Sequence, residues 1–151
     1  MRFSLIGTLV ALGALACGGG ERQAEQTPAG GQPAATPPSA PVVEVRMTGN
    51  GTNQAAFEPA AITIAPGTTV RFINATGGPH NVAFWGDSIP AGAAAVLNAA
   101  MPDRLNDLSS RFVTTPSEAL DIAFAGAPTG VYKAYCLPHL AMGMRLTITV
   151  Q

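Results

Sequence analysis

The sequence predicts an all-β fold, an antiparallel Greek-key sandwich of two sheets that carries one short helical insertion. Three observations support this prediction. Short segments with alternating apolar residues recur from Val42 to the C-terminus, Gly and Pro turns separate them, and one Ala-rich segment over residues 91–109 breaks the pattern. The chain has 151 residues, which suits one folded domain rather than two.

The N-terminus has the three parts of an export signal. Arg2 supplies a basic start, an apolar run extends from Leu5 to Leu15, and the small residues Ala14 and Ala16 precede Cys17. We therefore predict a signal peptide over residues 1–16 and a protein exported to the periplasm or the cell surface. A cysteine directly after such a run resembles the lipobox of bacterial lipoproteins, which implies a lipid on Cys17. The alternative is an ordinary secretory signal that happens to end before a cysteine.

A flexible tether is predicted over residues 17–41. Residues 18–41 hold five Gly, five Pro and five Ala, and they include no large aliphatic or aromatic residue. Such a segment buries too little apolar surface to offset the entropy lost on ordering. The folded domain is therefore expected over residues 42–151.

Alternating apolar residues place the strands of that domain. The second and third strands are centred on residue pairs two apart, and the Pro66-Gly67 turn separates them. In chain order we predict strands over Val42 to Met47, around Ile62 and Ile64, around Val70 and Phe72, and over Asn81 to Trp85, Ala119 to Phe124, Val131 to Cys136 and Met144 to Val150.

The Ala-rich segment is predicted to be helical. It combines strong helix formers with spaced apolar residues such as Leu97, Met101 and Leu105. Pro102 cannot donate a helical hydrogen bond, so we expect two short helical pieces on either side of it.

Charge and cysteine content exclude several classes of protein. Eight Lys and Arg against nine Asp and Glu leave a formal charge of −1, which excludes nucleic-acid binding by bulk electrostatics. Beyond the N-terminus no apolar run reaches the length of a spanning helix, so contact with a membrane is expected only through a lipid at Cys17. Cys17 and Cys136 could formally pair, but they belong to a processing site and to the folded domain respectively, and no disulfide is expected.

The candidate metal ligands lie beside turns. His80 and His139 are the two histidines of the chain, and Cys136, His139 and Met144 follow a Cys-x2-His-x4-Met spacing. Two imidazoles, a thiolate and a weak axial thioether form the ligand set of blue copper sites. Met142 is the rival of Met144 for the axial position. Two histidines cannot build the cluster of a multicopper oxidase, and no enzymatic activity is expected.

These motifs resemble the cupredoxins, the family of plastocyanin, pseudoazurin and amicyanin. FEPAAITIAPGTTVRFINATGGPHNVAF resembles the first strands and the first ligand motif of the family, and YCLPHLAMGMRLTITV resembles its C-terminal ligand loop. The resemblance implies one type 1 copper ion held by His80, Cys136, His139 and Met144. It also implies that Asn81 donates its backbone amide to the sulfur and joins the two ligand segments. Pro138 has no N–H for that sulfur, which tunes the reduction potential.

The expected function is one-electron transfer between redox partners outside the cytoplasm. The resemblance implies that electrons pass through the edge of His139, and that partners dock transiently on the apolar patch around it. The candidate patch residues are Leu137, Pro138, Leu140, Ala141 and Met142. We expect a monomer. Two alternatives stay open: a copper protein for storage or delivery without electron transfer, and a zinc-filled or metal-free interaction module. Trp85 is expected to pack in the core or against the insertion.

Overall fold

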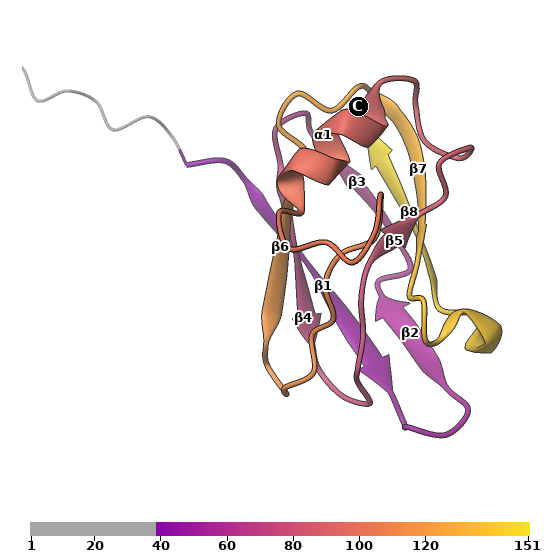
Figure 1. Ribbon diagram of the computed structural model, residues 1–151. Helices are drawn as coiled ribbons and strands as arrows, with labels where there is room; N and C mark the ends of the chain where they lie inside the picture. Colours follow the sequence, from indigo (N-terminus) through magenta and orange to yellow (C-terminus); the bar gives the residue numbers. More distant parts are fainter. Residues whose placement is uncertain (1–38) are drawn as a thin grey trace, which may run out of the picture. The chain divides into compact units, whose positions relative to one another are not determined.

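The computed structural model describes residues 39–151 (Figure 1). The predicted signal peptide, Cys17 and most of the predicted tether lie outside the described residues. The described part contains two four-stranded sheets, with strand orders β2-β1-β4-β6 and β3-β8-β7-β5. The strands are β1 (Val42–Gly49), β2 (Ala55–Glu58), β3 (Ala61–Ile64), β4 (Thr69–Asn74), β5 (Ala83–Phe84), β6 (Ala119–Ala123), β7 (Gly130–Tyr135) and β8 (Arg145–Val150). The helices are α1 (Ala93–Ala100) and the short 3-10 helix η1 (Leu140–Met142).

The core lies between the inner faces of the two sheets. In β4, Val70, Phe72 and Asn74 are buried and their neighbours are partly exposed, and in β8 Leu146, Ile148 and Val150 are buried in the same alternation. Successive side chains of a strand point to opposite faces, so a period of two places one apolar row against the facing sheet. The predicted β-sandwich is therefore confirmed.

The prediction that all strand pairs are antiparallel was wrong for two of them. β1 pairs in parallel with β4, with Val45 opposite Phe72, and β3 pairs in parallel with β8, with Ile62 opposite Ile148. Alternation reveals which residues face the core but not the direction of the neighbouring strand. β2, which was not predicted as a separate strand, extends the first sheet by antiparallel pairing with β1.

The prediction of two helical pieces in the insertion was wrong for the second piece. α1 begins after Gly92, buries Ala93 and Leu97, and ends at Ala100, with Met101 as its C-cap directly before Pro102. The residues after Pro102 form turns, and residues 108–113, which we call the strap, run beside residues 80–84 instead of forming a helix. Figure 1 shows α1 at the end of the sandwich away from η1. No helix of the described residues is long and apolar enough to cross a membrane.

Candidate metal centre

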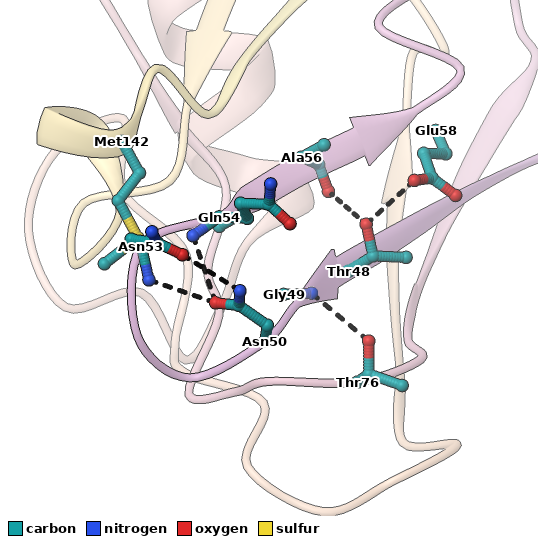
Figure 2. A pocket seen from close by; sticks show the side chains of 10 residues that line it. Thr48, Gly49, Asn50, Asn53, Gln54, Ala56, Glu58, Thr76 and Met142 are labelled. Carbon is teal, nitrogen blue, oxygen red and sulfur yellow. Dashed lines mark hydrogen bonds between the residues drawn. The ribbon is translucent and has the colours of Figure 1, made fainter.

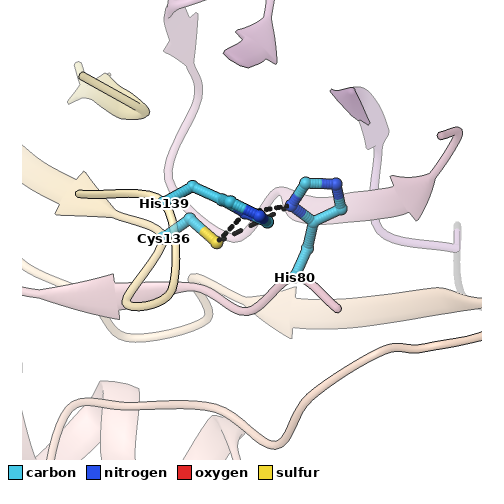
Figure 3. A group of neighbouring side chains, drawn as sticks. All are labelled: His80, Cys136 and His139. Carbon is cyan, nitrogen blue, oxygen red and sulfur yellow. Dashed lines mark hydrogen bonds between the residues drawn. The ribbon is translucent and has the colours of Figure 1, made fainter. Parts of the chain in front are cut away.

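Two loops bring three ligand side chains together at one end of the sandwich (Figure 3). His80 lies six residues beyond the end of β4, whereas Cys136 and His139 lie between β7 and η1. His80 Nδ1 is 3.7 Å from Cys136 Sγ and 3.1 Å from His139 Nδ1, and Cys136 Sγ is 3.5 Å from His139 Nδ1. The three atoms form a compact triangle, so one ion can contact all of them.

The hydrogen bond at His80 leaves its ligand nitrogen free for a metal. His80 Nε2 lies 2.9 Å from the carbonyl oxygen of Thr76 and can bond to it only as a donor. In a neutral imidazole the proton then sits on Nε2, and the lone pair of Nδ1 faces Cys136 and His139. Thr76 therefore sets both the tautomer and the orientation of the ring.

Burial keeps the ligands uncharged before a metal binds. Burial lowers the pKa of His80, against the opposing effect of its bond to Thr76. Burial and the nearby His80 ring lower the pKa of His139. Burial also raises the pKa of the Cys136 thiol, although the Asn81 N–H opposes this change. Two neutral imidazoles can ligate directly, and the thiol must lose its proton as it binds.

Asn81, which follows His80 in the first ligand segment, contacts the second ligand loop. Its backbone N–H points to Cys136 Sγ at 3.5 Å, and its side-chain oxygen accepts a 2.8 Å hydrogen bond from the N–H of Leu137. Asn81 is fully buried. These are the contacts that the cupredoxin resemblance implied for this residue.

The two candidate axial methionines differ in their surroundings. Met144 is fully buried, its N–H donates to His139 O, and its carbonyl oxygen accepts from the N–H of Cys136. Met142 is 37% exposed and lines a polar cleft of about 490 Å³ beside the β1–β2 turn. Figure 2 shows its side chain next to Asn53 in that cleft.

The structure adds site residues that the sequence analysis did not identify. Val113 exchanges two backbone hydrogen bonds with His80, at 3.0 and 2.8 Å. Ser109 and Ser110 accept hydrogen bonds from the side-chain amide of Asn81. These residues are about 30 positions from the first ligand and lie at the end of the predicted insertion over residues 91–109 or just beyond it, so no spacing linked them to the metal. The available signal was the pair of adjacent serines after Leu108.

The prediction that Trp85 packs in the core or against the insertion was wrong. Its ring lies 4.4 Å from that of Tyr135, and the Arg145 guanidinium lies 6.0 Å from the centre of the indole. Trp85 directly follows the buried end of β5 and points to the opposite side of the sheet, because successive side chains of a strand alternate.

The donor set fits copper. A thiolate and two imidazoles suit both oxidation states of copper. A β-sandwich with this buried site defines a cupredoxin. The family model for copper-binding proteins of the plastocyanin/azurin family matches residues 43–151, and the chain belongs to that family.

Plastocyanins are similar over nearly the whole domain. The plastocyanin of Ulva pertusa is 37% identical over 108 residues, which cover 72% of this chain and 99% of that protein. The plastocyanin of Prochlorothrix hollandica is 38% identical over 119 residues, or 78% of this chain and 79% of that protein. The oxidized plastocyanin of Dryopteris crassirhizoma matches with a TM-score of 0.54 and 28% identity, over 72% of this chain and all of that one. The protein is a blue copper electron-transfer protein, not an enzyme.

Proposed function

We propose that the protein carries single electrons at a copper site whose ligands are His80, Cys136 and His139, with Met144 as the weak axial ligand. The compact triangle of two Nδ1 atoms and one Sγ supports this assignment most strongly, since the three atoms lie within 4.8 Å of one another. When bound, copper supplies a Cu(II)/Cu(I) couple that accepts and releases one electron. The side chains supply a geometry that suits both states.

Met144 is the better axial candidate because of its burial and its backbone contacts. Hydrogen bonds from its N–H to His139 and from Cys136 to its carbonyl oxygen keep this residue beside both ligands. Met142 lies beside Asn53 in the polar cleft, where its thioether faces another part of the molecule.

Electrons are proposed to pass through His139. His80 and Cys136 are completely buried, whereas His139 retains 9% exposure. The residues close to it in the chain are apolar and at least partly exposed, with Leu137 at 48% and Met142 at 37% exposure, and Pro138, Leu140 and Ala141 complete the proposed patch. A small apolar surface suits the brief docking of a redox partner to a monomeric carrier.

Two residues are proposed to tune the reduction potential. The Asn81 N–H withdraws electron density from the sulfur, which favours the reduced state, and Pro138 lacks the N–H that could add a second such bond.

The proposed copper site can be tested by adding Cu(II) to the purified protein and recording its visible spectrum. We expect strong thiolate-to-copper absorption that ascorbate bleaches and an oxidant restores. Cys136→Ser should abolish this absorption and keep the folded far-UV spectrum. A colourless copper complex, or unchanged colour in Cys136→Ser, would contradict the site. Fast copper loss to a chelator without electron exchange with a cytochrome would instead favour storage or delivery.

We further propose that the chain is exported and that Cys17 carries a lipid. The basic start, the apolar run and the small residues before Cys17 support export, and the Gly- and Pro-rich tether suits an anchored protein. Cells that express the full chain should incorporate labelled palmitate into it, and Cys17→Ser should remove the label. A secreted, unlabelled wild-type protein would indicate an ordinary secretory signal.

A further inference from the structure

We infer that Ser109 and Ser110 are positioning residues for the copper ligands, which they hold through Asn81. For its copper-dependent part this inference rests on the proposed function. Ser109 is 8% exposed and Ser110 is completely buried. Both belong to the strap, and the hydrogen bonds of their side chains go to Asn81, Val82 and Arg111.

The strap forms an antiparallel ladder with the first ligand segment. His80 and Val113 exchange two backbone hydrogen bonds, the N–H of Ser110 donates to Val82 O at 2.9 Å, and the N–H of Phe84 donates to Leu108 O at 2.8 Å. The strap therefore acts as a neighbouring strand for residues 80–84, although these bonds lie outside the regular sheets. Its contact extends over the whole segment that carries His80 and Asn81.

The ladder contains an extra residue in the strap, opposite Asn81. Bridges join His80 to Val113 and Ala83 to Ser109, so three steps along the ligand segment correspond to four along the strap. A bulge of this kind disrupts regular pairing and re-aims nearby groups. Here the N–H of Val82 donates to the side-chain oxygen of Ser110 at 3.0 Å. A serine hydroxyl thus takes the place of a carbonyl oxygen.

The same bulge places two acceptors at the side-chain amide of Asn81. Asn81 Nδ2 donates to Ser109 Oγ at 3.1 Å and to Ser110 O at 3.5 Å. At the other end of this amide, Oδ1 accepts from the N–H of Leu137. With acceptors on the strap side and a donor on the loop side, one of the two amide orientations is selected.

A path of hydrogen bonds therefore joins the strap to the copper ligands. It runs from Ser109 to the Asn81 side chain, then to Leu137, which adjoins Cys136, while the backbone N–H of Asn81 reaches the sulfur itself. Because these groups are buried, a donor or acceptor left without its hydrogen-bond partner costs its full desolvation penalty. The hydroxyl of Ser109 should thus influence both the ligand loop and the sulfur.

The test compares Ser109→Ala with Ser109→Thr, which keeps the hydroxyl, and with the matched control Ser88→Ala, whose hydroxyl bonds only to Asp87. In the copper-free full chain, hydrogen exchange at the Leu137 amide should speed up about tenfold in Ser109→Ala. In the copper-loaded protein the thiolate-to-copper absorption should shift. The reduction potential should fall, because a loosened Asn81 withdraws less electron density from the sulfur. Ser109→Thr should restore all three properties.

Several outcomes would overturn the inference. One is a lower melting temperature for Ser109→Ala with unchanged exchange at Leu137 and an unchanged spectrum, which would make Ser109 a packing residue only. Another is an equal effect in Ser88→Ala. If the wild-type protein bound no copper, the proposed function would fail, but the copper-free exchange measurement would still decide whether Ser109 holds Asn81 and Leu137.

Discussion

Replacement of Met144 separates its role as a ligand from its role in packing. Met144 is completely buried beside the ligand loop. Met144→Ala opens a cavity and should lower the free energy of unfolding of the copper-free protein by about 2–5 kcal/mol. Met144→Leu nearly conserves the volume and should cost less than about 1.5 kcal/mol. Denaturant unfolding of the copper-free variants measures both values.

The copper-loaded Met144→Leu variant tests the ligand itself. A weak thioether donor stabilises the more highly charged Cu(II) state, so its loss should raise the reduction potential and change the visible spectrum. Protein-film voltammetry measures the potential, and Met142→Leu is the matched control because that side chain is 37% exposed. The assignment is refuted if Met144→Leu keeps the wild-type potential, above all if Met142→Leu changes it.

Three further predictions follow from described contacts. Arg111 and the backbone amides of Thr114 and Thr115 lower the pKa of Glu118 to about 2, so the carboxylate stabilises the fold above its ordinary pKa near 4.5, and this stabilisation is lost as the pH falls towards 2. Glu118→Gln should therefore lower the melting temperature at pH 7 but leave it near the wild-type value at pH 2; equal losses at both pH values would contradict this. Copper at a hundred times its Kd should stabilise the fold by about 2.7 kcal/mol, and a chelator should reverse the rise in melting temperature. Leu137→Glu should slow electron exchange with a soluble cytochrome and leave the visible spectrum unchanged. Val131 is also exposed but lies on another surface, so the Val131→Glu variant should exchange electrons at the wild-type rate.

Much of the fold could be predicted because its signals are local. Alternation in β4 and β8 depends only on neighbouring residues, and the inner rows of both strands are buried as expected. The direction of pairing is not local. β1 and β4 run in parallel because the chain passes through β3 in the other sheet before it returns to the first sheet with β4. The residues within β1 and β4 do not indicate this connection.

The chemistry of the site was determined by the sequence alone, since soft sulfur and two imidazoles at this spacing suit copper. The tertiary structure decided how those ligands are held. Thr76 orients His80, and the strap reaches Asn81 through Ser109, because folding brings together residues that are distant in the chain. It also placed Met144 in the core and Met142 in the cleft, although both stand close to His139 in sequence. Ligand identity is a property of single residues, whereas orientation and burial depend on nonlocal packing.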